Sequence, residues 1–488
     1  MGCPSSAWSR REVIAPRRPA VYTPAMVNVA SETFFEATAV ARPDRPALRT
    51  DLDCEVVVVG GGLAGLWTAL VLARRGRDVV VVEAGRIGAG ASGRNAGFVS
   101  AGYAEIPSRI LSRVGEDHAR ALWQLSAEGA EAVRSLIAET GMPGVEPAPG
   151  RLIAFRAAGE SVAARVAERM TRWGTLAEAW PRAQVREVLR SERYYTALHL
   201  PGAFQIHPLN FVLGLAAAVE AAGGRIFEST PVQAGDVAGV RKVIETPQAR
   251  LRAHEVVFCG SAGIGGAFPA LGRCILPVAR HIGVSAPLGE RLESAIRFAG
   301  AVSDTRQGGD HYRIIGDRLL WGGGLTTRTS PPARLDRLIA ADIAAVYPQL
   351  GPVEITHAWS GVTGSAVHLM PQIGRLGPGL WIASAFGGQG LAPTAIAGQL
   401  IASAILDADD RWRLFIPFGL VPATGVFGGF ATQLSFWSRR LQDRLDEALM
   451  RRAAPQGAAK AAKTPPCENP PPETPAVSGD DIAAVPST

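Results

Sequence analysis

The sequence is poor in lysine and cysteine, and it lacks long runs of one charge. Only three lysines occur among 488 residues (Lys242, Lys460 and Lys463), so arginine carries nearly all the positive charge. The five cysteines form no C-x-x-C pair, which argues against a disulfide framework or a zinc site and favours a reducing, cytoplasmic setting. With a net charge of only +6 and no basic run interleaved with aromatics, the chain is not predicted to bind nucleic acid.

Clear targeting and membrane-spanning segments are also lacking. Residues 1–25 hold no apolar core of a secretory signal, and two interpretations stay open for them: an extension before a true start at Met26, or a disordered arm. Residues 414–437 carry no charge, but Pro417 and Pro422 argue against a spanning helix. That segment is interpreted as a packed apolar arm, with peripheral membrane contact as the alternative. The Ala/Pro-rich residues 451–488 predict a disordered tail.

What the sequence does have is a glycine-rich turn between two valine runs. Residues 56–59 predict a buried strand, residues 63–75 an apolar helix, and residues 78–82 a second strand. Gly60, Gly62 and Gly65 fit G-x-G-x-x-G, in which the glycines allow a tight turn, close approach of a pyrophosphate and close helix packing. The amide groups at the helix start would face the phosphates. Strand, turn, helix and strand in this order predict a dinucleotide site.

The acid that ends the second strand narrows the choice of dinucleotide. Glu83 follows the last fingerprint glycine at the spacing expected of a residue that accepts hydrogen bonds from ribose hydroxyls. A 2′-phosphate at this place would meet a like charge, so NADP is disfavoured. FAD and NAD remain, and a distant segment distinguishes them. Residues 380–405 predict a strand, a glycine loop and a helix, and the loop and helix start are suited to closing a flavin site.

The remaining patterns predict an α/β protein with a discontinuous Rossmann-like FAD-binding domain and an inserted α+β substrate domain built on an antiparallel sheet. Helical patterns lie at 106–140 and 334–346, and strands at 151–156 and in the hairpin around 310–324. The expected division is a partly disordered N-terminal arm (1–50), the FAD-binding domain (51–105, 200–275 and 355–410), the substrate domain (106–199 and 276–354), a C-terminal arm and helix (411–450), and the tail (451–488).

Four segments together resemble the glycine/D-amino acid oxidase (DAO) superfamily of FAD-dependent oxidoreductases. They are FFEATAVARPDRPAL (34–48), GAGASGRNAGF (88–98), HPLNFVLGLA (207–216) and FGGQGLAPTAIAGQLIA (386–402). Within the superfamily the likeness is to the γ-glutamylputrescine oxidoreductase-like branch. It implies FAD, a substrate sheet above the flavin, and oxidation of a C–N bond. The sequence departs from relatives at His368 and Leu369, where they carry a more polar pair, and at Gln389, where a histidine is frequent.

The resemblance also implies which residues hold the cofactor. The expected set is Gly60, Gly62, Leu63, Ala64, Gly65, Glu83 and Ala84 for the ADP half, Ser92, Arg94, Asn95, Ala96 and Gly97 along the pyrophosphate and flavin, Val232 and Gly260 near adenine and pyrophosphate, and Gly387, Gln389, Gly390 and Leu391 at the flavin ring. Covalent relatives attach flavin through His or Cys. Arg94 stands in the first of those regions and no cysteine lies between Cys274 and Cys467, so non-covalent FAD is expected.

Amine oxidation by flavin needs placement more than acid–base groups, and no strong acid–base motif is visible. An apolar roof would help an alkylamine, whose pKa is ~10.4 in water, to lose its proton. The candidate catalytic residues are Arg280, His281, Tyr312 and Arg313, all in predicted strands, with His311 beside them and Trp321 and Trp359 as apolar walls. A structural role is the alternative for each histidine.

Three hypotheses follow. The first is an FAD-dependent amine or amino-acid oxidoreductase that passes electrons to oxygen. The second is a membrane-associated dehydrogenase that uses quinone, and the third is a non-catalytic flavin-binding assembly protein. Lys242 is expected in a solvent-exposed hairpin, so no lysine is predicted near the flavin to assist oxygen; Arg280 or His281 would supply that charge. The small-molecule partner is an amine, whose identity stays open, as does the oligomeric state.

Overall fold

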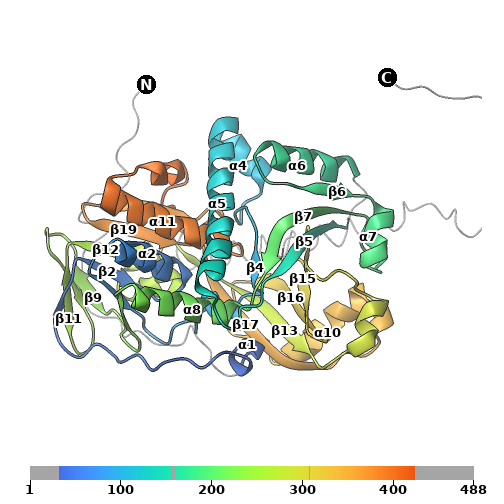
Figure 1. Ribbon diagram of the computed structural model, residues 1–488, viewed down its shortest axis with the longest axis horizontal. Helices are drawn as coiled ribbons and strands as arrows, with labels where there is room; N and C mark the ends of the chain where they lie inside the picture. The colour runs from blue at the N-terminus through green and yellow to red at the C-terminus, as the bar shows by residue number, and fades with distance from the viewer. Residues whose placement is uncertain (1–31, 157–159, 307, 424–488) are drawn as a thin grey trace, which may run out of the picture.

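The computed structural model describes residues 32–156, 160–306 and 308–423. Two large sheets stand side by side in Figure 1, with the long helix α5 (Glu116–Thr140) between them. The predicted C-terminal helix and tail lie outside the described residues. Within those residues, no helix is long and apolar enough to cross a membrane.

The first sheet is the dinucleotide-binding half that the valine runs predicted. Its order is β18 (Gln372–Gly377), β19 (Leu380–Ser384), β12 (Glu255–Phe258), β2 (Val56–Val59), β3 (Val79–Val82) and β8 (Arg225–Phe227). The five strands from β19 to β8 are parallel, and β18 is antiparallel at the edge. All four residues of β2 and of β3 are buried, as expected for strands covered on both faces. The Rossmann-like fold is confirmed.

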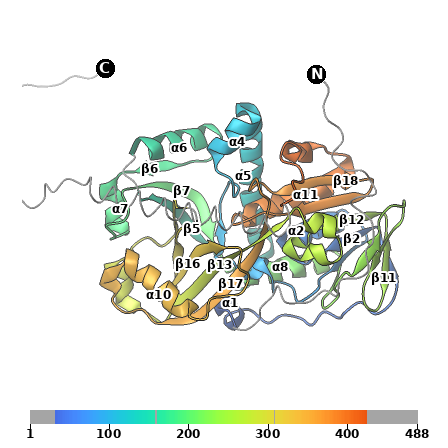
Figure 2. The ribbon, with the colours of Figure 1, turned by 180° about the vertical axis from the view of Figure 1, so that it is seen from behind.

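Helices pack against this sheet. They are α2 (Leu63–Arg74), α8 (Pro208–Ala221) and α11 (Leu391–Asp407). In Figures 1 and 2 these three helices lie in the same half of the molecule as β2 and β12. A four-stranded sheet flanks the first one, in the order β1 (Leu52–Asp53), β11 (Arg250–Ala253), β10 (Lys242–Glu245) and β9 (Ala234–Asp236). The backbones of α5 and α11 touch, because a Cβ on Gly129 would lie 2.2 Å from the carbonyl oxygen of Ala392.

The second large sheet has nine strands and is mostly antiparallel. Its order is β17 (Ile355–Ser365), β13 (Leu276–Ser285), β16 (Arg318–Thr326), β15 (His311–Ile315), β14 (Ala301–Asp304), β5 (Ala148–Phe155), β7 (Thr196–Gln205) and β4 (Phe98–Val99), with β6 (Glu178–Trp180) pairing with β7. The helices α4 (Pro107–Val114), α6 (Glu160–Arg172), α7 (Arg182–Val188) and α10 (Leu335–Val346) belong to the same half. The short helices α1 (Phe34–Ala37), α3 (Ala91–Arg94) and α9 (Pro269–Gly272) complete the set.

Three expected boundaries differ from the strand pairing. Residues 355–365, 98–99 and 200–205 were assigned to the FAD-binding domain, but β17, β4 and the end of β7 pair within the nine-stranded sheet. The reason is that a strand pattern shows where a strand runs and not which sheet it joins. The helical region 106–140 is also divided, since Gly115 adopts a positive φ of 82° between α4 and α5. The remainder of the domain division stays a prediction.

Candidate active site

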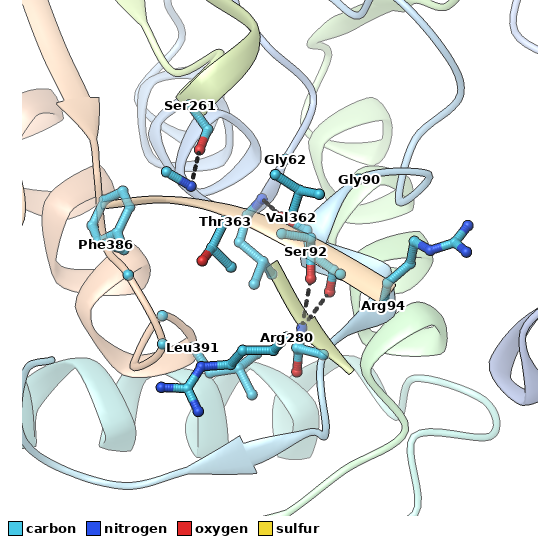
Figure 3. A pocket seen from close by; sticks show the side chains of 18 of the residues that line it. Gly62, Gly90, Ser92, Arg94, Ser261, Arg280, Val362, Thr363, Phe386 and Leu391 are labelled. Carbon is cyan, nitrogen blue, oxygen red and sulfur yellow. Dashed lines mark hydrogen bonds between the residues drawn. The ribbon is translucent and has the colours of Figure 1, made fainter. Parts of the chain in front are cut away.

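A cavity of about 1430 Å³ lies where the two large sheets meet. Its walls come from the loops after β2, β3 and β12, from α3, from the faces of β13 and β17, and from the loop before α11. That volume exceeds the roughly 300–1,000 Å³ of ordinary small-molecule pockets, so a dinucleotide and a small substrate both fit. Figure 3 shows Ser92, Ser261, Arg280, Thr363 and Phe386 around it.

The glycine turn at one end of the cavity leaves no room for side chains. Gly60 has a φ of +110°, and a Cβ there would lie 2.8 Å from the carbonyl group of Cys259. A Cβ on Gly65 would lie 2.0 Å from the carbonyl oxygen of Gly60, so Gly65 allows α2 to pack on β2. Gly62 caps α2 without a side chain, and the Leu63 amide is bound by Ser92 Oγ at 3.0 Å. This helix start is suited to a pyrophosphate.

Glu83 is held in place by two backbone amides. Its Oε2 accepts from Gly61 N at 2.8 Å and its Oε1 from Gly85 N at 2.9 Å. Burial raises the pKa of Glu83, and the hydrogen bonds from the two backbone amides offset part of that rise. Each carboxylate oxygen keeps a lone pair for a ribose hydroxyl.

Glu83→Ala is expected to weaken FAD binding by ~1.5–3 kcal/mol, roughly tenfold to a hundredfold, because two hydroxyls lose a charged acceptor. The FAD content after dialysis measures this. Glu83→Gln is the matched control, since it keeps an acceptor of the same shape and should lose less FAD. Unchanged FAD content in Glu83→Ala would remove Glu83 from the cofactor site.

The middle of the cavity is built by α3 and the turn after it. Asn95 Nδ2 donates to Ser92 O at 2.7 Å, and Asn95 Oδ1 accepts from Gly97 N at 2.8 Å. The Arg94 side chain is buried, and its Nη1 lies 3.7 Å from Glu36 Oε1. In Figure 3 it points in a different direction from the Arg280 side chain. The Arg94 carbonyl oxygen accepts from Trp359 Nε1 at 3.0 Å. This turn therefore joins the two sheets.

The loop before α11 closes the cavity. Gly387 has a positive φ of 63°, and Gln389 Nε2 donates to Ser100 Oγ at 2.9 Å. Leu391 begins α11, so the positive end of a 17-residue helix faces the cavity. Such an end stabilises negative charge by roughly 0.3–1 kcal/mol.

Two half-buried arginines without acidic partners face the other side of the cavity, and we call them the arginine pair (Arg151 and Arg280). Arg280 makes no hydrogen bond or ion pair with any described residue, and a Cβ on Gly388 would lie 2.8 Å from its Nη2. Arg151 donates to Ser100 Oγ at 2.5 Å and to Ser303 Oγ at 3.2 Å, while its buried Nε has no partner in the described part of the chain.

Desolvation lowers the pKa of both members of the arginine pair, that of Arg151 to about 10. A guanidinium with such a pKa still carries its full positive charge at neutral pH. Burial lowers the pKa of His311 to about 3, and the positive charge of Arg280 contributes a smaller part of this shift. The imidazole is therefore neutral at physiological pH. The arginine pair thus remains cationic and uncompensated, which favours an anionic ligand.

A compact charge cluster is formed by Arg156, Asp304, Arg306 and Asp310, and the last three of these residues line the cavity. Arg156 Nε binds Asp304 at 2.7 Å, and its Nη2 binds Asp310 at 2.6 Å. Arg306 binds both carboxylates. Burial and the neighbouring Asp304 raise the pKa of Asp310 to about 7. These two carboxylates are therefore already paired and do not compensate Arg280.

Three predicted catalytic residues do not line the cavity. Tyr312 lies behind the sheet, where its ring stacks on Trp321 at 4.4 Å and its hydroxyl contacts that of Tyr347 at 2.6 Å. Arg313 is buried and donates to Ile206 O at 2.9 Å. His281 points away from Arg280, because successive strand residues alternate, and contacts Ser360 Oγ at 2.8 Å. None of these three side chains lines the cavity, whereas Arg280 does, and a catalytic role for the four residues stays a prediction.

Most predicted cofactor residues line the cavity. The exceptions are Gly65 and Gly97, which allow close backbone packing, and Val232, whose neighbour Pro231 lines it instead. Trp321 and Trp359, which were expected as apolar walls, also lie outside the lining. The apolar side chains that line the cavity include Ile153, Ile282 and Phe386. Lys242 is buried rather than exposed, and its Nζ donates to Val240 O at 3.1 Å, away from the cavity. Arg151, Glu36 and Arg42 also line the cavity, and no motif in the sequence pointed to them.

Comparison with known proteins agrees with this geometry. The model of the DAO family, described as FAD dependent oxidoreductase, matches residues 55–404. The chain belongs to the DAO family of FAD-dependent oxidoreductases. Among curated relatives of this family, the γ-glutamylputrescine oxidoreductase of Escherichia coli is 32% identical over 405 residues, which is 81% of this chain and 93% of the relative.

Solved structures show the same fold. The glycine oxidase of Geobacillus kaustophilus superposes with a TM-score of 0.63 at 21% identity, covering 76% of this chain and all of that one. The L-proline dehydrogenase of P. horikoshii gives a TM-score of 0.62 at 18% identity, covering 75% and 96%. The resemblance seen in the sequence is confirmed. The chain is an FAD-dependent oxidoreductase, which decides against the third hypothesis.

Proposed function

We propose that this oxidoreductase oxidises the C–N bond of an amine that also carries a carboxylate, forming an imine, with oxygen as the final acceptor. The arginine pair is the observation that carries the proposal. Bound FAD supplies the acceptor for the hydride that leaves the carbon beside nitrogen. The glycine turn, Glu83 and the start of α11 would hold that cofactor.

The arginine pair supports an anionic substrate group. Two half-buried guanidiniums without acidic partners lose part of their solvation, which a carboxylate would replace, and a guanidinium binds a carboxylate with paired hydrogen bonds. Fixing the carboxylate at Arg280 would orient the rest of the substrate along the cavity. The name of the Escherichia coli relative gives a substrate of this class, since the γ-glutamyl group of γ-glutamylputrescine carries a carboxylate and its putrescine end an amine.

The same surroundings favour the neutral amine, which is the form whose lone pair assists hydride loss. Ile153, Ile282 and Phe386 desolvate an ammonium group, and the positive charge of Arg151 repels it. His311 is uncharged, so it neither repels nor stabilises an ammonium group electrostatically. The cavity therefore needs no strong base to supply the reactive form.

The test is an anaerobic panel in which bleaching of the flavin band reports reduction. γ-Glutamylputrescine and other carboxylated amines should bleach the enzyme, whereas putrescine and the amide of the same carboxylate should do so much more slowly. Equal bleaching by the carboxylate and its amide would overturn the substrate class. No bleaching by any amine would overturn amine oxidation itself.

The pH dependence of turnover provides a second test. The amine bound in the cavity should titrate at least about 1 unit below its value in water, because both desolvation and Arg151 disfavour the ammonium form. The kcat of the wild type should thus reach its plateau at a lower pH than titration of the free amine predicts. Arg151→Met should move that rise back to higher pH. An unshifted profile in the variant would show that Arg151 does not act on the amine.

A further inference from the structure

An extended segment before the first strand crosses the outside of the cavity, and we call residues 32–48 the N-terminal strap. It begins at α1 and runs along α8, and Figure 1 shows it as the blue trace along the lower edge of the dinucleotide-binding half. The strap contains one of the segments that resemble the superfamily (34–48), but it precedes residue 55, where the match to the family model begins. None of its residues was expected to hold the cofactor.

One aromatic side chain anchors the start of the strap. Phe35 is fully buried, with its ring 4.9 Å from that of His207 and 5.6 Å from that of Trp359. A capping box closes α1, in which Glu36 N donates to Thr33 Oγ1 at 3.0 Å and Thr33 N donates to Glu36 Oε2 at 2.7 Å. Since His207 caps α8 and Trp359 belongs to β17, Phe35 fastens the strap to both halves of the protein.

Polar contacts anchor its other end. Arg45 is almost fully buried and binds both carboxylate oxygens of Glu220, at 2.7 and 2.8 Å. Leu48 N donates to Thr230 Oγ1 at 3.0 Å. Between the anchors, Val40 N donates to Asn210 Oδ1 at 2.9 Å. The strap is thus fixed along its length.

Three charged residues of the strap line the cavity, and they are Glu32, Glu36 and Arg42. Glu36 lines it beside Arg94. Arg42 lines it close to Arg86 and Glu228, with no hydrogen bond or ion pair to any residue of the described ranges. Burial and the charge of Arg86 lower the pKa of Arg42, yet the guanidinium remains cationic. A cation on this wall is suited to the pyrophosphate of FAD.

We propose that the N-terminal strap is a clasp that retains FAD, with Phe35 as its fastener and Arg42 as its contact with the anionic part of the cofactor. Loosening Phe35 would let the strap swing away from the cavity, so FAD would leave and re-enter faster. Removing the charge of Arg42 would weaken the hold on FAD without opening the strap.

The experiment follows FAD release from the full-length holoenzyme as the rise of flavin fluorescence on dilution, and FAD rebinding to the apoprotein as its quenching. Phe35→Ala should release FAD at least about tenfold faster, equivalent to about 1.4 kcal/mol in the barrier, and should also rebind it faster. Arg42→Met should speed release alone and make it less sensitive to salt.

Phe34→Ala is the matched control, since it removes a half-buried ring from the same helix that contacts His357 outside the cavity lining. It should leave both rates within about twofold of wild type. Wild-type release rates in both Phe35→Ala and Arg42→Met would overturn the proposal. Should Phe35→Ala fail to fold, Arg42→Met alone decides, because its side chain is only partly buried. No substrate is present, so the result is independent of the proposed reaction.

Discussion

Arg280→Met is expected to lower kcat/KM for a carboxylated amine by about a hundredfold or more, because a charge-assisted contact contributes roughly 1.5–3 kcal/mol and a bidentate one more. Steady-state turnover with the carboxylated amine and with its amide measures the effect. With the amide as substrate, the kcat/KM of the wild type and that of the variant should differ little, because the amide has no carboxylate for Arg280 to bind. A loss of the same size with both substrates would mean that Arg280 acts on something other than the carboxylate.

The same variant tests the electron acceptor. If the positive charge of Arg280 also assists the reaction with oxygen, the reduced variant should reoxidise in air more slowly than the reduced wild type in stopped-flow measurements. The wild-type rate should stay nearly flat with pH, because arginine does not titrate in the usual range. Equal rates would remove Arg280 from this step. Slow reoxidation of both would favour the dehydrogenase alternative.

Arg156→Met is expected to destabilise the protein by about 3–5 kcal/mol, because it leaves buried carboxylates with only one cationic partner. Asp304 has a fully buried side chain and Asp310 one that is 8% exposed. Denaturant unfolding of the FAD-loaded protein measures the change. Arg306→Met is the matched control and should cost less, since the Arg306 side chain is 28% exposed and is partly screened by solvent.

The loss in Arg156→Met should also depend on pH. Because the pKa of Asp310 is already raised to about 7, this carboxyl group takes up a proton readily once a cationic partner is removed. Its uncompensated charge then disappears, so the stability difference from wild type should narrow as the pH falls from about 8 to about 7 and stay constant below, where Asp310 is protonated in both proteins. A constant difference across the whole range would show that removing Arg156 leaves the pKa of Asp310 unchanged.

The dinucleotide half could be predicted from sequence because its constraints are local. The strand, glycine turn and helix from Val56 to Arg74 follow each other in the chain, and close contacts at Gly60 and Gly65 demand glycine. The loop at Gly387–Leu391 was predictable for the same reason, since a glycine turn that begins a helix is visible in a short window.

The substrate side could not be predicted in this way. Arg151 and Arg280 stand four strands apart in the sheet, and only the tertiary fold brings their guanidiniums to one cavity. The alternation in β15 predicts that Tyr312 faces away from His311 and Arg313, but it does not show which of the two faces lines the cavity, so it could not reveal that Tyr312 lies outside the lining. Arg313 shares the cavity-side face with His311 and still lies outside the lining, because its guanidinium bonds Ile206.

The strand order of the six-stranded sheet has a consequence for how the enzyme is made. β2 emerges early, yet its neighbour β12 comes some two hundred residues later, and β19 and the loop before α11 emerge later still. A nascent chain therefore carries the glycine turn long before the opposite wall of the cavity exists. Such distant pairings are slow to form and leave strand edges open in the meantime. The cofactor site is thus complete only after the loop before α11 has emerged, and FAD supply would influence the yield of folded enzyme more than its rate of synthesis.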